Sequence, residues 1–211
     1  MEPRIPCRAR RSAAALALAS LAFLAGACTQ LKRCAYEEIG RDEWQQPERV
    51  VEALALEPGS RVADLGSGGG YFTFRLARAL GPAGRVYAVD VDEGLNAYVA
   101  ERAEKEGLAN IEVVLAEDND PKLPEPVDLV FTSDTYHHLE DRTRYFSNAK
   151  QYLRPHGRVA IVEFGEAPSW FLPSHATSAE TIRSEMEAAG YRFVEAHDFL
   201  ERQHFLVFSV D

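Results

Sequence analysis

A glycine-rich stretch with an acid just before it is the part of this 211-residue sequence best suited to chemistry. Residues 62–70 read VADLGSGGG, and they lie between a short apolar segment and an expected helix. Glycine adopts positive φ easily and lets the backbone pass close to a ligand. We therefore expect a ligand-binding turn at Gly66, Ser67 and Gly68, where a strand gives way to a helix.

The residues around this turn indicate which ligand it takes. A dinucleotide-binding turn reads Gly-x-Gly-x-x-Gly, and here Tyr71 stands in place of the third glycine. The carboxylate of Asp64 would repel a pyrophosphate and attract a cation. Asp90, at the end of the next expected strand, can accept hydrogen bonds from ribose hydroxyls. Asp118, after the third strand, could meet the amino group of an adenine. These residues favour S-adenosylmethionine, which carries an ammonium and a sulfonium group.

A second polar group follows the fourth expected strand. Ser133 and Asp134 come directly after it, and His137 and His138 follow within four residues. Histidine titrates near neutrality, so His137 or His138, with Asp134, is the candidate general base. An ordinary structural role at the start of a helix remains open for either histidine. The other histidines show no metal-ligand spacing, and we expect no metal site.

Strands and helices alternate along the chain from residue 47. The expected strands are Arg61–Leu65, Arg85–Asp90, Ile111–Ala116, Val127–Thr132, Arg158–Phe164, Tyr191–His197 and Phe205–Val210. The expected helices are Pro47–Leu56, Phe72–Leu80, Leu95–Glu106, Arg142–Leu153 and Ala179–Ala189, the last with a capping box of Thr177 and Glu180.

This alternation predicts an α/β fold with a mainly parallel, seven-stranded, Rossmann-like sheet and helices on both faces. No helix separates the last two strands, so we expect a hairpin with an antiparallel edge strand at the C-terminus.

Four stretches in this order resemble the successive motifs of class I S-adenosylmethionine-dependent methyltransferases. They are VADLGSGGGYFTFRLA, VYAVDVD, VDLVFTSDTYHHL and LRPHGRVAIVEF, and the resemblance covers residues 47–211. It implies that Asp64, Gly66, Gly68 and Asp90 contact the cofactor, with Asp118 carried over less securely. It also implies methyl transfer by in-line displacement. The sequence has no Asn-Pro-Pro-Tyr motif after the fourth strand, which argues against methylation of amides or exocyclic amines.

The first 27 residues differ in composition from the rest. Four arginines precede an apolar run of 15 residues, 13–27, which is shorter than the roughly 20 residues of a membrane-spanning helix. This pattern is typical of a secretory signal peptide. The ending LAGAC resembles a bacterial lipoprotein box, although Ala25 stands where such boxes usually carry Leu. We expect export to a bacterial periplasm or a membrane-tethered state. Lipidation at Cys28, cleavage nearby and an uncleaved anchor remain open.

The charge and the cysteines exclude several classes of function. Removing residues 1–27 removes four arginines and one glutamate, which takes the formal net charge from −10 to −13. So acidic a domain is a poor binder of nucleic acid. Cys7, Cys28 and Cys34 all precede the expected domain, so residues 35–211 contain no disulfide, cysteine nucleophile or thiolate metal ligand.

We therefore divide the chain into a signal peptide or anchor (1–27), a tether (28–46) and a cofactor-binding domain (47–211). The expected function is methyl transfer to a small-molecule acceptor. An exported S-adenosylmethionine-binding protein without catalysis and a nicotinamide-dependent oxidoreductase are the alternatives. The acceptor pocket is expected from residues 41–46, 133–141 and 165–176, the last holding the apolar residues Trp170, Phe171 and Leu172. The acceptor itself and the oligomeric state are not predicted.

Overall fold

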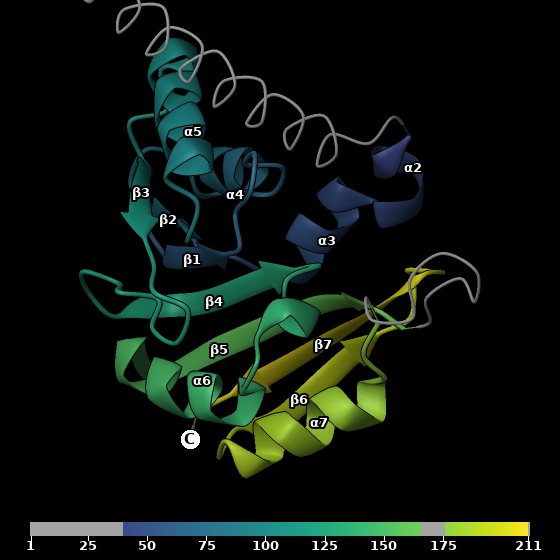
Figure 1. The fold of residues 1–211 in the computed structure, drawn as a ribbon. Coiled ribbons are helices and arrows are strands. Elements are labelled where there is room, and N and C mark those ends of the chain that lie inside the picture. Colours follow the sequence, from purple (N-terminus) through teal and green to yellow (C-terminus); the bar gives the residue numbers. More distant parts are fainter. Residues whose placement is uncertain (1–39, 166–175, 211) are drawn as a thin grey trace, which may run out of the picture.

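A seven-stranded sheet forms the centre of the molecule (Figure 1). The computed structural model describes residues 40–165 and 176–210. The strand order is β3-β2-β1-β4-β5-β7-β6, and the first five of these strands are parallel to one another. The strands are β1 Arg61–Leu65, β2 Arg85–Asp90, β3 Ile111–Leu115, β4 Val127–Ser133, β5 Leu153–Phe164, β6 Arg192–His197 and β7 Gln203–Ser209.

Helices cover both faces of the sheet. They are α2 Arg41–Gln45, α3 Pro47–Ala53, α4 Thr73–Leu80, α5 Glu93–Glu106, α6 Arg142–Ala149 and α7 Ala179–Ala188, with two short 3₁₀ helices, η1 Tyr136–His138 and η2 Lys150–Tyr152. Helices α3, α4 and α5 lie on one face, and α6 and α7 lie on the other (Figure 1). Three of these helices have an N-cap side chain that accepts a hydrogen bond from a backbone N–H of the first turn. The caps are Asp92 for α5, Asp141 for α6 and Ser178 for α7.

The expected fold class is confirmed, with one difference at the end of the sheet. Strand β7 is antiparallel to both β5 and β6, as expected for a hairpin. It lies between these two strands, however, so β6 and not the antiparallel strand forms the edge. The reason is burial: β7 is almost fully buried, whereas β6 is mostly exposed, and an inner position suits the more apolar strand.

Several boundaries differ from those expected. Helix α6 ends at Ala149 instead of Leu153, and α3 ends at Ala53 instead of Leu56. Strand β5 begins at Leu153, paired with Val127, because a bulge in the β4–β5 pairing allows the strand to continue through Pro155 and Gly157. Helix α7 is capped by Ser178, whose hydroxyl accepts the backbone N–H of Thr181, and not by Thr177. The backbone N–H of Thr177 instead donates to the carbonyl of Phe164 at 2.9 Å, which keeps this residue outside the helix.

The tether boundary is also corrected. Residues 41–45, which we expected to belong to a polar tether, form helix α2. Gln45 is fully buried and Trp44 contacts the ring of Phe164 at 5.5 Å between centroids. The folded unit therefore includes α2, because polar side chains of this segment find buried partners at the sheet.

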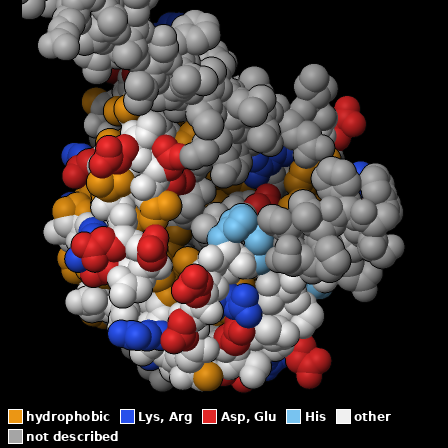
Figure 2. Space-filling model, in the orientation of Figure 1, with side chains coloured by type: hydrophobic (Ala, Val, Ile, Leu, Met, Phe, Trp, Pro, Cys, Tyr) orange, Lys and Arg blue, Asp and Glu red, His pale blue; other side chains and the backbone are white. Residues whose placement is uncertain are grey.

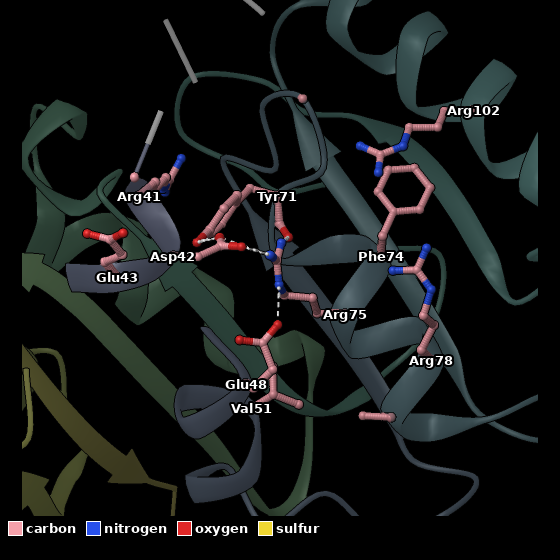
Figure 3. Close-up of a pocket in the computed structure, with 13 residues that line it drawn as sticks. Arg41, Asp42, Glu43, Glu48, Val51, Tyr71, Phe74, Arg75, Arg78 and Arg102 are labelled. Atoms are coloured by element: carbon pink, nitrogen blue, oxygen red, sulfur yellow. Dashed lines mark hydrogen bonds and ion pairs between the residues drawn. The ribbon is translucent and has the colours of Figure 1, made fainter. Parts of the chain in front are cut away.

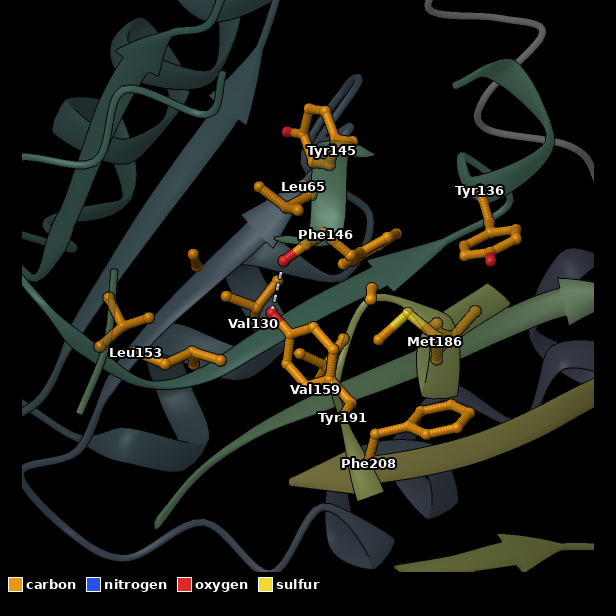
Figure 4. Close-up of a cluster of buried hydrophobic side chains, with 14 of the residues drawn as sticks. Leu65, Val130, Tyr136, Tyr145, Phe146, Leu153, Val159, Met186, Tyr191 and Phe208 are labelled. Carbon is orange, nitrogen blue, oxygen red and sulfur yellow. Dashed lines mark hydrogen bonds between the residues drawn. The ribbon is translucent and has the colours of Figure 1, made fainter. Parts of the chain in front are cut away.

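The core has one layer on each side of the sheet. Residues that alternate along β1, β4 and β5 supply both layers, as in any strand covered on both faces. On the side of α6 and α7, aromatic rings pack around Phe146, and the hydroxyl of Tyr191 donates to the backbone carbonyl of Phe146 at 2.9 Å (Figure 4). Burial of these rings fixes both helices on the sheet.

Several expectations fall outside the described residues. They are the signal peptide, Cys28, the tether up to residue 39 and the apolar residues Trp170, Phe171 and Leu172. Within residues 40–165 and 176–210, no helix has the length and apolar character needed to cross a bilayer.

Asn110 provides a test of this packing. Its side-chain amide donates to the carbonyls of Ala77 and Gly81 at 2.8 and 2.9 Å, and these carbonyls lie at the C-terminal end of α4. Because the end of a helix leaves carbonyls without partners, Asn110→Ala should lower the free energy of unfolding by about 1–3 kcal/mol. Urea unfolding measures the change, with Asn119→Ala at an exposed position as the control. Equal effects of the two substitutions would contradict the prediction.

Candidate active site

The candidate site lies at the carboxyl ends of β1, β2 and β4. Strand β1 pairs with β2 on one side and with β4 on the other, and the chain leaves β1 and β4 in different directions. In an open parallel sheet this reversal of strand order opens a crevice in which ligands bind. The loops after the two strands supply Ser67, Asp134, His137 and His138.

The glycine loop follows β1 and bends sharply at three positive φ angles. Gly66, Gly68 and Gly70 have φ of 70°, 53° and 85°. The backbone N–H groups of Gly66 and Ser67 both donate to the carbonyl of Val89, at 2.8 and 3.1 Å, which anchors the loop to β2. A Cβ at Gly66 would lie 2.1 Å from the hydroxyl oxygen of Thr135. Glycine is therefore required here by both conformation and space.

Two acids flank this loop. Asp64 is 3 % exposed and accepts a hydrogen bond from the hydroxyl of Thr73 at 2.6 Å. Burial raises its pKa to about 6, against the lowering effect of the Thr73 bond. Asp90 ends β2 and accepts the backbone N–H bonds of Gly68 and Asp92, both at 2.9 Å. The structure thus brings together Asp64, Asp90 and the loop between them, as the sequence predicted.

Ser67 also belongs to this group. It is 6 % exposed, and its hydroxyl oxygen has no hydrogen-bond partner among the described residues. Buried polar groups nearly always have partners, so an unpaired hydroxyl inside a glycine loop indicates a place for a polar ligand.

The two remaining predicted cofactor contacts differ in position. Ser133 ends β4, and its hydroxyl accepts a hydrogen bond from the side-chain amide of Gln45 at 2.9 Å. Asp118 lies in the turn after β3, is exposed, and makes no contact with the other predicted site residues in the described part of the chain. Ser133 therefore joins the site by geometry, and the role of Asp118 stays a prediction.

Asp134 is held by three donors from distant parts of the sequence. Its carboxylate accepts hydrogen bonds from Arg41 at 3.2 Å, from Gln45 at 3.1 Å and from Gln203 at 2.5 Å. Its backbone has φ of 54°, a conformation that non-glycine residues rarely adopt. Burial raises its pKa to about 6, although Arg41 acts in the opposite direction. These bonds join α2 and β7 to the site through Asp134, and its role as a base stays a prediction.

The two histidines follow in η1 and differ in their surroundings. The side chain of His137 is 6 % exposed, and its Nδ1 lies 2.9 Å from a carboxylate oxygen of Glu163, which is fully buried on β5. The ring centroids of His138 and His137 lie 4.1 Å apart, and His138 is exposed. Histidine side chains form a patch over the segment between β4 and α6 (Figure 2). Of the two, His137 has the buried carboxylate partner that a general base needs.

Sequence reasoning missed Glu163 and Gln203. Glu163 follows four buried apolar residues, 159–162, and a carboxylate at the end of such a strand is a usable signal. Gln203 begins β7, and nothing in its neighbourhood in the sequence points to Asp134. Arg41 and Gln45 fall within the segment expected to border the acceptor, but the sequence does not indicate their bonds to Asp134.

A cleft of about 880 Å³ lies beside the glycine loop (Figure 3). Gly69, Tyr71 and residues of α2, α3, α4 and α5 line it. The guanidinium groups of Arg41 and Arg75 lie 3.9 and 4.3 Å from the centre of the Tyr71 ring, and the Tyr71 hydroxyl donates to Asp42 at 2.5 Å. We place the site at the strand ends and not in this cleft, because the buried acids and His137 do not line it. The contacts of Tyr71 with Arg41 and Asp42 hold α2 beside the site.

The described residues contain no group of three or more His, Cys, Asp or Glu side chains that could hold a metal ion. The site offers instead buried carboxylates for a cationic ligand, a glycine loop for close approach and one histidine–carboxylate pair. This set can bind an organic cation and accept a proton.

The chain is similar to a known protein family and to several known proteins. A family described as "Methyltransferase domain" matches residues 56–201. Arsenite methyltransferase of Halobacterium salinarum is 35% identical over 154 residues, 67% of this chain and 39% of the relative. Malonyl-[acyl-carrier protein] O-methyltransferase of Methylococcus capsulatus is 33% identical over 140 residues, 66% of this chain and 46% of the relative. The chain thus spans less than half the length of these two relatives.

A solved structure is similar over almost its whole length. It is a SAM-dependent methyltransferase from Aquifex aeolicus, with a TM-score of 0.78 and 28% sequence identity, covering 85% of this chain and 97% of that one.

Asp64 makes the pH dependence of stability testable. Its folded-state pKa of about 6 lies above the ordinary value of 3.8, so the unfolded chain ionises first. Ionisation therefore lowers stability, with no effect below about pH 4 and the full effect above about pH 6. Asp64→Asn, which still accepts the Thr73 bond, should be more stable than the wild type by up to about 3 kcal/mol at pH 8 and equal to it at pH 4.

Urea unfolding between pH 4 and pH 8 measures this difference. Asp118→Asn, at an exposed position, is the control and should show no such trend. A constant difference between Asp64→Asn and the wild type across this range would contradict the burial of an ionisable Asp64.

Proposed function

The chain belongs to the S-adenosylmethionine-dependent methyltransferase family, and from this premise we propose that it transfers a methyl group from S-adenosylmethionine to a small-molecule acceptor. The observation that carries the proposal is the pair of acids around the glycine loop, with Asp64 buried before it and Asp90 bonded to its backbone. A nicotinamide-dependent oxidoreductase is not supported, because the family is a different one and the third glycine of the dinucleotide turn is Tyr71.

The residues present fit S-adenosylmethionine. Asp64 is a buried carboxylate whose charge an ammonium group would neutralise. This ion pair would offset the free-energy cost of burying the charge. Asp90 accepts one backbone bond at each oxygen, and a carboxylate oxygen can accept a second, so both can also take ribose hydroxyls. The unpaired hydroxyl of Ser67 can bond the polar end of the same ligand.

When bound, S-adenosylmethionine supplies an activated methyl group that a nucleophile displaces from sulfur. The chain's part is to align the two reactants and to take up the proton that some acceptors lose. Asp134 holds α2 and β7 at the strand ends, and His137 is the group placed to accept a proton.

The acceptor does not carry over from the relatives. Arsenite and the malonyl group named for two of them differ entirely in chemistry. Trivalent arsenic is a soft centre that binds thiolates, and residues 35–211 contain no cysteine, so arsenite is not our proposal for this chain. A small organic acceptor fits the acidic domain better than nucleic acid does.

The same residues argue against a binding protein that lacks catalysis. Cofactor binding needs neither a buried carboxylate on β5 nor a histidine bonded to it, yet both are present beside the site. Burying this pair costs free energy of folding, and a role in catalysis explains its presence.

Calorimetric titration of S-adenosylmethionine into the full chain tests the proposal. We expect micromolar binding, and at least a tenfold loss in Asp64→Ala, because the charge-assisted contact to the ammonium group is removed. Asp141→Ala, at the capping residue of α6 away from the glycine loop, is the control and should bind as the wild type does. A folded wild-type chain that fails to bind would end the methyltransferase proposal.

We further propose that the chain is exported and tethered through Cys28, on the strength of the basic start, the apolar run 13–27 and the LAGAC ending. Expressed in a bacterium with radiolabelled palmitate, the full chain should carry the label in the cell envelope. Cys28→Ala should lose the label, while Cys34→Ala keeps it. An unlabelled chain of full mass in the cytosol would contradict both export and lipidation.

A further inference from the structure

A buried hydrogen-bonded pair joins His137 of η1 to Glu163 of β5. The Nδ1 atom of His137 lies 2.9 Å from one oxygen of Glu163, and the backbone N–H of His137 donates to the other oxygen at 3.1 Å. Glu163 is fully buried, and the side chain of His137 is 6 % exposed. Ring and backbone of one residue are thus both fastened to a single carboxylate, which fixes the orientation of the imidazole.

The hydrogen-bond donors around Glu163 determine which ring nitrogen of His137 carries the proton. The oxygen that faces Nδ1 also accepts the backbone N–H of Phe164 at 2.8 Å. Each carboxylate oxygen therefore already accepts one backbone N–H, and an ionised carboxylate accepts hydrogen bonds without donating any. Facing an ionised Glu163, the ring would donate from Nδ1, which would make Nε2 the basic nitrogen of the neutral imidazole.

We propose that Glu163 is a positioning residue that keeps His137 in its Nδ1–H form, so that Nε2 takes a proton from the acceptor during methyl transfer. The proposal rests on the proposed function. It deepens that function by naming the class of acceptor, which is a hydroxyl group or an acidic carbon that carries a proton at the atom methylated.

Methyl transfer forms one bond to the methyl carbon and breaks another. The acceptor's oxygen or carbon forms a bond to the methyl carbon while the carbon–sulfur bond breaks, and the electron pair of that bond stays on sulfur. The acceptor's proton passes to Nε2 of His137, which becomes an imidazolium. The carboxylate of Glu163 stabilises this cation through the Nδ1–H bond, since hydrogen bonds between ionised partners are the stronger ones.

A purely structural role explains the pair less well. Glu163 follows the buried residues 159–162 of an apolar strand, where a Val or Ile would pack without a charge to bury. The segment η1 also has a separate anchor, because the hydroxyl of Tyr136 donates to Glu185 of α7 at 2.7 Å. The loop does not depend on Glu163 alone for its position, so the Glu163 carboxylate is available for chemistry.

Nitrogen-15 NMR of the full chain labelled in histidine tests the tautomer directly, and it needs no acceptor. In the wild type the ring of His137 should carry its proton on Nδ1. In Glu163→Gln the amide can donate to Nδ1, so the Nε2–H form should increase at least tenfold relative to the other. His137→Gln identifies the resonance.

Matched controls keep the result interpretable. Glu185→Gln loosens the same segment without touching the ring of His137 and should keep the Nδ1–H form. Glu163→Asp keeps a carboxylate and should retain more of that form than Glu163→Gln does. A wild-type ring protonated mainly on Nε2, or an unchanged tautomer in a folded Glu163→Gln, would overturn the proposal.

Titration of the same samples with S-adenosylmethionine separates the two possible failures. Binding with the wrong tautomer overturns the role of Glu163 alone, whereas the right tautomer without binding overturns the proposed function. Turnover of a tertiary amine or a thioether that survives His137→Gln unchanged would overturn the acceptor class, because such acceptors have no proton to give.

Discussion

The parallel pairing of β1 with β4 is the interaction on which the rest of the site depends. These strands join the two halves of the sheet in a continuous register from Val62 and Leu129 to Leu65 and Thr132, and the hydroxyl of Thr132 adds a bond to the carbonyl of Leu65 at 3.1 Å. The loops that follow them consequently meet, with Thr135 lying directly against Gly66. The glycine loop after β1 and the loop after β4 that carries Asp134 and His137 are both positioned by this seam between the two strands.

Three carboxylates lie near that seam, of which Asp64 and Glu163 are buried and Asp134 is partly buried, and each is stabilised in a different way. Asp64 has a hydroxyl partner, Asp134 has a guanidinium and two amides, and Glu163 has an imidazole and two backbone N–H groups. Buried charges of this kind add little to stability and often reduce it. Their concentration at one end of the sheet therefore marks the place where the fold gives up stability for function.

Local patterns were enough to predict the strands and the glycine loop. The bounds of β1 and β2 agree with expectation because each is a short apolar run between turn residues, and Asp64 and Asp90 follow from their places at or near the strand ends. A signal of this kind depends only on neighbours in the sequence.

Contacts between distant segments were not predictable in this way. Glu163 reaches His137 because β5 lies beside β4, and Gln203 reaches Asp134 because β7 lies beside β5. The sequence predicts a tether in place of helix α2, because five polar or aromatic residues have no period of their own. The order of this helix comes from partners such as Asp134. These features are fixed by tertiary structure, which overrides local preference.

The inner position of β7 has a consequence for the order in which the protein is made. In the chain β7 follows every other described element, yet it lies between β5 and β6 and supplies the Gln203 bond to Asp134. During synthesis β6 emerges before the strand that links it to the sheet, and β5 has an open side until β7 arrives. A nascent chain that stops short of β7 lacks the strand that pairs with both β5 and β6. Assembly of the site thus waits until β7 has been made, and a chain that stops before this strand is left with unpaired strand edges that a cell's proteases and chaperones can recognise.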